Sequence, residues 1–349
     1  MKRITFYFLL FTLLLASCAP TPAPTSAGPQ TITVLTHDSF AISEDVVKAF
    51  EADNNAKVSF IQSGDAGSML NQSILTKDAP IADVIFGVDN TFLSRALEAD
   101  IFEAYQSPEL TNIADEFKLD PSNRALPVDY GDVCINYDKA YFTENNLAVP
   151  QSFEDLAKPE YKGVLVVEDP ATSSPGLAFL LATRAHFGDG YLNYWKSLKD
   201  SGVVVVDGWE TAYYTNFSAS SGKGPQPMVV SYASSPAAEV FFASEPLTDS
   251  PTASIVASGM CFRQIEFVGI LKNGQNKDLA QKFVDFMLSQ KFQEDMPLNM
   301  FVYPVNKNAQ LPEVFTNFAQ IAESPAALST AEIASNRDAW IEAWTAAMK

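Results

Sequence analysis

Residues 164–176 read VLVVEDPATSSPG, and this stretch decides the fold of the chain. The apolar run Val164–Val167 predicts a buried strand, which Asp169-Pro170 ends because proline lacks a backbone donor and has a fixed φ. Ser174 then fits the N-cap of an apolar helix, with Pro175 at its first position. A strand, a polar loop and a helix in this order indicate an α/β protein.

The loop between this strand and this helix is a candidate binding loop. A helix that begins there directs free backbone N–H groups, and its positive dipole end, toward whatever the loop faces. The same residues also suit an ordinary capped connection that binds nothing. Ser231–Pro236 shows the same pattern, serines and a proline before another expected helix, and this second occurrence favours the interpretation as binding loops.

The N-terminus predicts export. Lys2 and Arg3 precede the apolar run Ile4–Leu15, which is too short to span a bilayer and is typical of a secretory signal peptide, residues 1–17. Leu15-Ala16-Ser17-Cys18 resembles the bacterial lipobox, in which cleavage leaves a lipid-bearing cysteine. We therefore expect Cys18 to be lipidated; an ordinary signal peptide followed by an incidental cysteine is the alternative.

The mature chain is expected to be an acidic globular protein on a membrane surface. Residues 18–30 form a Thr- and Pro-rich flexible tether, and 349 residues with 47% apolar content suffice for two lobes. Removal of Lys2 and Arg3 changes the formal net charge from −19 to −21, because 21 basic residues remain against 42 acidic ones. This charge opposes nucleic-acid binding and attracts cationic solutes. We expect the protein to be extracytoplasmic and lipid-anchored, at the periplasmic face or outer surface of the cell membrane.

The remaining cysteines, Cys134 and Cys261, each lie in an apolar, strand-like segment. They could pair in an oxidising compartment or could equally be small buried residues. No Cys-x-x-Cys spacing occurs, and His37 and His186 are the only histidines, so we expect no structural zinc site.

Three strand–helix units open the folded chain, with strands expected at 31–36, 58–61 and 82–86. Their succession predicts a parallel sheet covered by helices, and ligands of such sheets bind beyond the carboxyl ends of the strands. The third strand is followed by the expected loop Gly87–Asn90, and the candidate site loops are His37-Asp38, Gly64–Ser68 and Asp89-Asn90.

The later elements repeat this alternation without an internal repeat. Further strands are expected at 133–137, 203–206, 228–231 and 261–270. Helices are expected at 153–156, 177–185, 191–198, 210–216 and 278–287, and a last one begins at the capping-box sequence Ser329–Glu332.

Nine short motifs carry a family resemblance that covers nearly all of the chain after the tether. They are THDSF (36–40), AFEAD (49–53), GVDN (87–90), DYG (129–131), DPATSSPGL (169–177), GWETAY (208–213), SY (231–232), YPV (303–305) and RDAW (337–340). In this order, they resemble the periplasmic thiamine-binding proteins of bacterial ABC importers, within the type II solute-binding family. Each motif alone is weak, but the set is specific.

The resemblance implies an α/β protein with the two-lobe type II periplasmic-binding-protein fold, whose hinge crossover strands would be 133–137 and 261–265. The first lobe would comprise residues 31–128 and 266–349, the second 129–265, with C-terminal helices able to pack back on the second lobe. If the crossover strands lie side by side, Cys134 and Cys261 could approach each other.

The resemblance also implies the ligand, thiamine or its mono- or diphosphate, bound in the cleft between the lobes. The cationic ring would lie near acidic and aromatic side chains, and the phosphate near loop donors. Carried over by motif, the ligand-binding residues are His37, Asp38, Asp65, Ala66, Ser173, Trp209, Tyr232 and Phe301. Independently, Trp209 lies on an expected turn and not on an amphipathic face, which suits a cation–π contact.

Three departures from the family pattern fall on the heterocycle: His37 replaces a tyrosine, Ala238 an aromatic residue and Phe301 a tryptophan. A different solute therefore stays open: a polyamine-like cation, another aromatic cationic metabolite, or a phosphorylated or phosphonate compound. Ferric iron is not expected, because Tyr213-Tyr214 falls on a predicted helix and not in a site loop.

A secreted hydrolase is the alternative from another class. It would need a nucleophile with a base, or a carboxylate pair, in one cleft, and no Gly-x-Ser-x-Gly, His-Glu-x-x-His or P-loop pattern occurs. We expect a non-catalytic monomer without cofactor or metal that delivers its solute to an ABC permease and its ATPase.

Overall fold

The computed structural model describes residues 28–219 and 223–349. The expected signal peptide, Cys18 and most of the tether lie outside the described residues. Within the described ranges, no helix is both long enough and apolar enough to cross a membrane.

One mixed sheet runs through the molecule in the order β2-β1-β3-β10-β5-β8-β6-β7. At one end, β1 (Gln30–Thr36) pairs in parallel with β2 (Ala56–Gln62) and β3 (Val84–Asp89), as the three strand–helix units predict. At the other end, β6 (Leu165–Glu168) pairs in parallel with β7 (Val204–Val206) and β8 (Met228–Tyr232). The short strands β4 (Phe102–Glu103), β9 (Thr252–Ile255) and β11 (Tyr303–Pro304) pair with the central strands.

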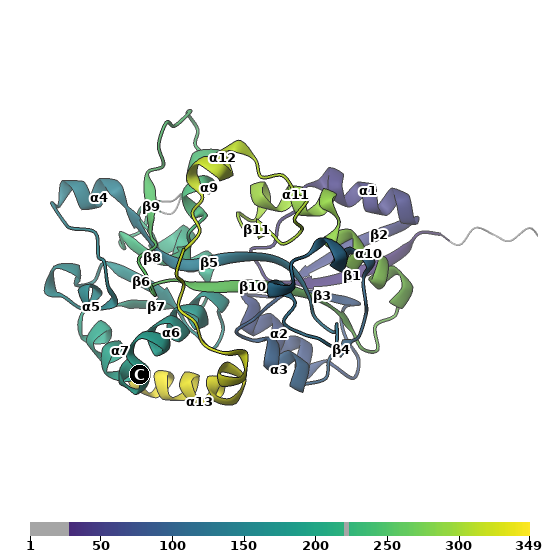
Figure 1. Cartoon of the computed structure of the whole chain (residues 1–349), viewed down its shortest axis with the longest axis horizontal. Helices are drawn as coiled ribbons and strands as arrows, with labels where there is room; N and C mark the ends of the chain where they lie inside the picture. The colour runs from purple at the N-terminus through teal and green to yellow at the C-terminus, as the bar shows by residue number, and fades with distance from the viewer. Residues whose placement is uncertain (1–27, 220–222) are drawn as a thin grey trace, which may run out of the picture.

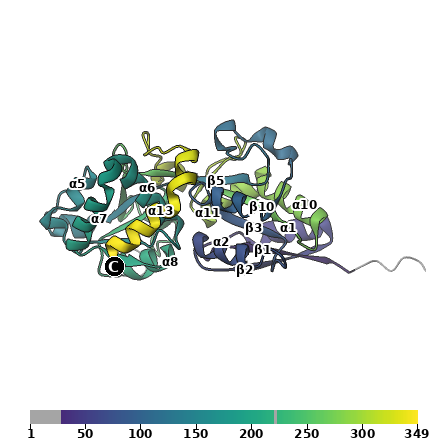
Figure 2. The ribbon, with the colours of Figure 1, turned by 90° about the horizontal axis from the view of Figure 1, so that it is seen from below.

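Two long antiparallel strands, β5 (Leu126–Asp138) and β10 (Phe262–Leu271), join the two ends of the sheet and run between two lobes (Figures 1 and 2). β10 pairs with β3 on one side, and β5 pairs with β8 on the other. Both strands are almost wholly buried, although each carries charged side chains. The expected two-lobe fold with crossover strands is confirmed.

Helices cover both lobes. Around β1–β3 lie α1 (Glu44–Asn54), α2 (Ala66–Leu75), α3 (Leu93–Glu98), α10 (Lys277–Leu288) and α11 (Gln290–Asn299) (Figure 1). Around β6–β9 lie α4 (Lys139–Glu144), α5 (Phe153–Leu156), α6 (Ser174–Phe187), α7 (Tyr191–Asp200), α8 (Trp209–Thr211) and α9 (Ser235–Phe241). α12 (Glu313–Phe318) packs on α9.

Residues 164–176 form β6 and the first turn of α6, but the N-cap of the helix differs from the expected one. The N-cap of α6 is Ser173 and not Ser174, because the Ser173 hydroxyl accepts a hydrogen bond from the N–H of Gly176 at 3.4 Å. Ser174 and Pro175 therefore lie inside the first turn, which is buried. A Cβ at Gly176 would lie 2.6 Å from the carbonyl oxygen of Glu168, so this close approach of helix to strand requires glycine.

Two expected elements differ in the structure. Gly87–Asp89 continues β3 and is not a loop, because Gly87 adopts φ +102° and makes room for the ring of His37. The expected helix at 210–216 is a single turn, α8, followed by the π-helical turn Ala212–Asn216, whose wider spacing turns neighbouring side chains to new directions.

The C-terminal helix α13 (Thr330–Met348) crosses from one lobe to the other (Figure 2). Trp344 packs edge-on against Trp195 of α7, with the ring centroids 5.3 Å apart. Nearer its start, Arg337 donates to the Ser94 hydroxyl of α3 at 3.2 Å and lies over the ring of Phe92. The helix thus contacts both lobes on the side away from α9 and α12 (Figure 1).

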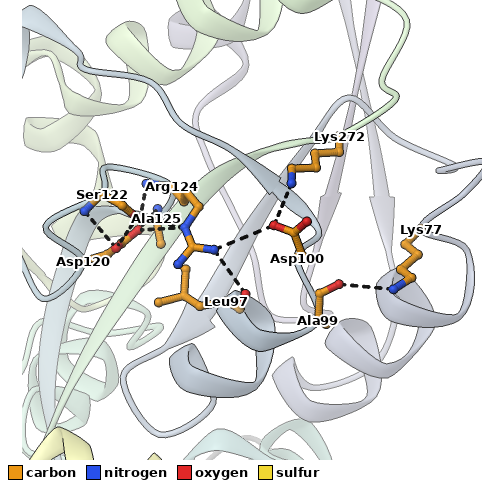
Figure 3. A network of polar contacts seen from close by, with 9 residues as sticks. All are labelled: Lys77, Leu97, Ala99, Asp100, Asp120, Ser122, Arg124, Ala125 and Lys272. Carbon is orange, nitrogen blue, oxygen red and sulfur yellow. Dashed lines mark hydrogen bonds and ion pairs between the residues drawn. The ribbon is translucent and has the colours of Figure 1, made fainter.

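A polar network fastens the irregular segment before β5 to the first lobe (Figure 3). The Asp120 carboxylate accepts hydrogen bonds from the backbone N–H groups of Ser122, Arg124 and Ala125. The Arg124 guanidinium reaches the Leu97 carbonyl at 3.2 Å, at the end of α3. This segment is irregular because side chains, and not a regular ladder, satisfy its backbone.

A disulfide joins Cys134 of β5 to Cys261, which immediately precedes β10. The sequence left this pairing open. It forms because Val133 pairs with Phe262 in the antiparallel register, which sets the two cysteines opposite each other. The bond links the two crossover strands on the second-lobe side of the hinge.

Replacing both cysteines by alanine should lower the free energy of unfolding by about 2–5 kcal/mol, because the bridge closes a long loop in the unfolded chain. Denaturant unfolding of the oxidised protein and the double variant measures this loss. Reductant should destabilise the native chain and leave the double variant unaffected. Equal stability of the two oxidised proteins would contradict the prediction.

Candidate functional site

A cavity of about 280 Å³ lies between the lobes, beside the crossover strands. The first lobe lines it with His37–Ala41, which follow β1, with Glu266 of β10 and with Asn299–Val302, which follow α11. The second lobe lines it with Trp209 and Glu210 of α8, the π-helical turn, Tyr232 and residues of α9. Of the three loops that the positional argument selects in the first lobe, only His37-Asp38 lines the cavity; Gly64–Ser68 and Asp89-Asn90 do not.

The second-lobe wall is aromatic and rigid. Trp209 stacks on Tyr213 with ring centroids 5.0 Å apart, and Tyr214 meets the indole edge-on at 5.4 Å. The indole Nε1 donates to the Ser231 hydroxyl at 2.9 Å, and that hydroxyl lies 2.9 Å from the Ser235 hydroxyl. The serines of the segment 231–236 thus orient the indole, and a flat or cationic ligand can pack on this wall without reordering it.

The first-lobe wall is acidic. Burial, followed by the negative charge of Asp65, raises the pKa of Asp38. Burial, followed by the charges of Asp38 and Asp65, raises the pKa of Glu210 on the opposite side. Because these carboxylates destabilise one another, a cation in the cavity would be stabilised by all of them.

Phenylalanine side chains fill the far end of the cavity. Phe301 lies between Phe242, with ring centroids 5.5 Å apart, and Phe315, at 6.5 Å. The small side chain of Ala238 lies at the same end. Ala238 and Phe301 are smaller than the residues of the family pattern, and Phe242 of the second lobe occupies part of the space that they leave.

Five of the eight predicted binding residues line this cavity, and they are His37, Asp38, Trp209, Tyr232 and Phe301. Asp65, Ala66 and Ser173 lie beside it, where the two lobes touch. The Asp65 carboxylate caps α2 and accepts hydrogen bonds from the Ser174 N–H at 3.2 Å and the Trp209 N–H at 3.1 Å, both in the second lobe. The backbone N–H of Gly67 donates to the Thr172 carbonyl across the same contact at 3.0 Å.

This contact occupies the backbone donors that the sequence predicts for an anion site. The N–H groups expected to face an anion already donate to the Asp65 carboxylate, and the Ser173 hydroxyl caps its own helix. Asp65 thus fastens the two lobes together on the edge of the cavity.

Sequence reasoning missed several lining residues. Tyr213 and Tyr214 fall on a predicted helix and so were not expected in a site loop, yet both line the cavity from the π-helical turn. The Tyr213 hydroxyl donates to Glu239 at 2.6 Å. Glu266 was read as part of an apolar strand, although an acidic residue between Ile265 and Phe267 is itself a signal of function.

The chain is similar to known binding proteins along nearly its whole length. A family model described as "Bacterial extracellular solute-binding protein" matches residues 79–317. The "Thiamine-binding periplasmic protein" of Escherichia coli K12 is 32% identical over 332 residues, which cover 93% of this chain and 95% of that protein. The protein of the same name from Brucella suis is 30% identical over 335 residues, 93% and 94% of the two chains.

Solved structures agree with these similarities. A "Periplasmic thiamin binding protein" superposes with a TM-score of 0.82 at 29% identity, covering 92% of this chain and 97% of that one. The fructose-6-phosphate-bound protein AfuA of Actinobacillus pleuropneumoniae reaches a TM-score of 0.77 at 22% identity, covering 91% and 98% of the two chains. The second likeness concerns the fold alone.

Replacing Asp65 by alanine should favour separation of the lobes, because two charge-assisted hydrogen bonds across the contact are lost, each worth about 1.5–3 kcal/mol. Small-angle scattering should give a larger radius of gyration than for the native chain. Asp78→Ala, at an exposed acid of the same lobe, is the control and should scatter like the native chain. A radius unchanged by Asp65→Ala would show that this contact does not hold the lobes together.

Proposed function

Since this chain belongs to the bacterial extracellular solute-binding protein family, we propose that its interlobe cavity binds thiamine or a thiamine phosphate. Members of this family bind solutes for ABC import and are not enzymes, and the chain is accordingly a binding protein of such an importer. Its partners are a small-molecule ligand and an ABC transporter. The thiamine specificity is our inference from the relatives and from the cavity.

The observation that carries this proposal is an aromatic wall facing carboxylates across one cavity. Thiamine joins a permanently cationic thiazolium ring to a planar aminopyrimidine. Trp209 and Tyr214 offer ring faces and edges to such groups, and Asp38, Glu210 and Glu266 offer negative charge and acceptors. Cation–π contacts of this kind contribute about 0.5–2 kcal/mol, more when water is excluded.

The phosphorylation state of the ligand depends on Asp65. A phosphate at the lobe contact would have to displace the Asp65 carboxylate from the N–H groups of Ser174 and Trp209. Thiamine itself needs no such displacement, and this favours the unphosphorylated form. Among the other solutes, a polyamine-like cation would use the carboxylates but not the stacked rings, and a phosphonate would meet an acidic wall.

We also propose the cellular setting of the protein. The family is extracellular or periplasmic, and the lipobox sequence ending at Cys18 supports cleavage after residue 17 and anchoring by lipid. We take the moving units to be residues 31–128 with 266–349, and 129–265, and the working form to be a monomer. β5 and β10, which pass from one unit to the other, support this division.

Replacing Trp209 by alanine should weaken thiamine binding about tenfold or more, because the indole is a central ring of the cavity wall. Titration calorimetry measures the affinity, and circular dichroism checks that the fold is retained. Trp340→Phe, on α13 and outside the cavity, is the matched control and should bind like the native chain. Equal thiamine affinity of Trp209→Ala and native protein would place the ligand elsewhere.

The intact mass of protein extracted from membranes should correspond to a chain that begins at Cys18 and carries a diacyl or triacyl modification. Cys18→Ser should remove the acyl mass and release the protein from the membrane fraction. A native chain that begins elsewhere without added mass would contradict lipidation and leave the solute-binding proposal intact.

A further inference from the structure

Three carboxyl groups lie side by side on adjacent strands of the hinge, beneath the cavity. Glu266 of β10 pairs in register with Asp89 of β3 on one side and with Asp129 of β5 on the other. Asp89 and Asp129 are fully buried, and Glu266 is only 5% exposed. Of the three, Glu266 lines the cavity, and Asp129 lies behind it.

Within the described residues, no lysine or arginine forms an ion pair with any of these carboxyl groups. One oxygen of Asp89, Oδ1, accepts hydrogen bonds from Thr91 and Phe92, whereas its Oδ2 has no hydrogen-bond partner in the described chain. Neither oxygen of Asp129 receives a hydrogen bond from an N–H or hydroxyl group of the described chain. The Glu266 carboxyl is instead its neighbour, because Glu266 pairs with Asp129 in register on the adjacent strand and both side chains are buried.

Two carboxyl groups in such contact cannot both be ionised at low cost, so one proton is held between them. Burial raises the pKa of Asp129 to about 7. Burial and the neighbouring charge of Asp129 raise the pKa of Glu266 well above its usual value. The pair therefore holds a proton near neutral pH, when the cavity contains no cation.

Three further titratable side chains lie near Glu266, and they are His37, Tyr232 and Asp89. His37, after β1, has its Nε2 3.5 Å from a Glu266 oxygen, and its Nδ1 lies 2.9 Å from the Ser39 hydroxyl. From β8, the Tyr232 hydroxyl lies near Glu266 and accepts a hydrogen bond from Gln264 at 3.0 Å. Asp89 adds a further negative charge from β3. His37 is the neighbouring base that a test of the pair must control for.

We propose that Glu266 is the counter-ion of the bound cation, and that ligand binding expels to solvent the proton that Glu266 shares with Asp129. This inference rests on the proposed function, because it assigns one residue to the cationic heterocycle of the ligand. No bond other than this O–H bond changes. Glu266 thereby distinguishes cationic ligands from neutral ones of the same shape, since only a cation stabilises the fully ionised pair.

The shared proton determines how the affinity for a cation depends on the pH. Below the pKa of the pair, binding must remove a proton, so affinity falls as the pH falls. Above that pKa the pair is already ionised, and affinity no longer depends on the pH. The thiazolium ring of thiamine carries a permanent positive charge, so this pH dependence of the affinity does not come from titration of that ring.

Thiamine binding to the full-length mature chain is measured by calorimetry at about pH 6 in two buffers of different ionisation enthalpy, which gives a release of about one proton per ligand. Glu266→Gln should bind about tenfold or more weakly and release no proton. Asp129→Asn donates its amide to Glu266 and holds it ionised, so binding should stay tight at acid pH and proton release should vanish. Glu154→Gln, at an exposed acid of α5, is the control for loss of one charge.

His37→Gln completes the set and should still release the proton. Proton release that vanishes in His37→Gln but persists in Glu266→Gln would assign the titration to the imidazole and overturn the inference. Tight thiamine binding by the native chain without proton release would overturn it while leaving the proposed function standing. Absence of thiamine binding by the native chain would remove both. Because His37→Gln and Asp129→Asn also distinguish the imidazole from the carboxyl pair as the source of the proton, a Glu266 variant that fails to fold does not prevent the test.

Discussion

The structure depends on one constraint, that a single sheet must serve two lobes. β5 and β10 belong to both halves, so a change in the angle between the lobes must be taken up where these two strands cross. The Cys134–Cys261 disulfide links them on one side of that crossing, and the carboxyl groups of Asp129 and Glu266 meet on the other. The floor of the cavity is therefore formed by the two strands that join the lobes, so a ligand resting on it would contact the elements that a hinge motion of the proposed lobes would bend.

The electrostatics of the cavity follow from burying negative charge without a basic partner. The chain carries a large acidic excess, but most of it is exposed, where water and salt screen it. Around the cavity the carboxyl groups of Asp38, Glu210 and Glu266 are withdrawn from water, and their pKa values rise accordingly. A cationic solute bound there would supply the charge that the protein lacks, and the stacked rings of Trp209 and Tyr213 would offer it a flat surface.

The Asp65 carboxylate makes the contact between the two lobes at the edge of the cavity. The same carboxylate that caps α2 also caps the backbone of the facing lobe, at Ser174 and Trp209. Closure thus satisfies N–H groups that would otherwise need water or an anion. The helix N-termini that the sequence marks as an anion site serve in this arrangement as an attachment between lobes, close to the indole that faces the ligand.

The sequence by itself determined the alternation of strands and helices, because caps, apolar periods and turn residues act over short distances. The resemblance of its motifs to a known family added the two-lobe class and, from the aromatic lining of the cavity, Trp209, Tyr232 and Phe301. It misplaced the α6 cap by one residue and read Gly87–Asp89 as a loop, since the packing of His37 on Gly87 cannot be seen locally. Only the tertiary structure decided that Glu266 meets Asp129, that Asp65 reaches the other lobe and that Cys134 pairs with Cys261. These partners are far apart in the chain, and the strand register that brings them together arises only when the whole sheet forms.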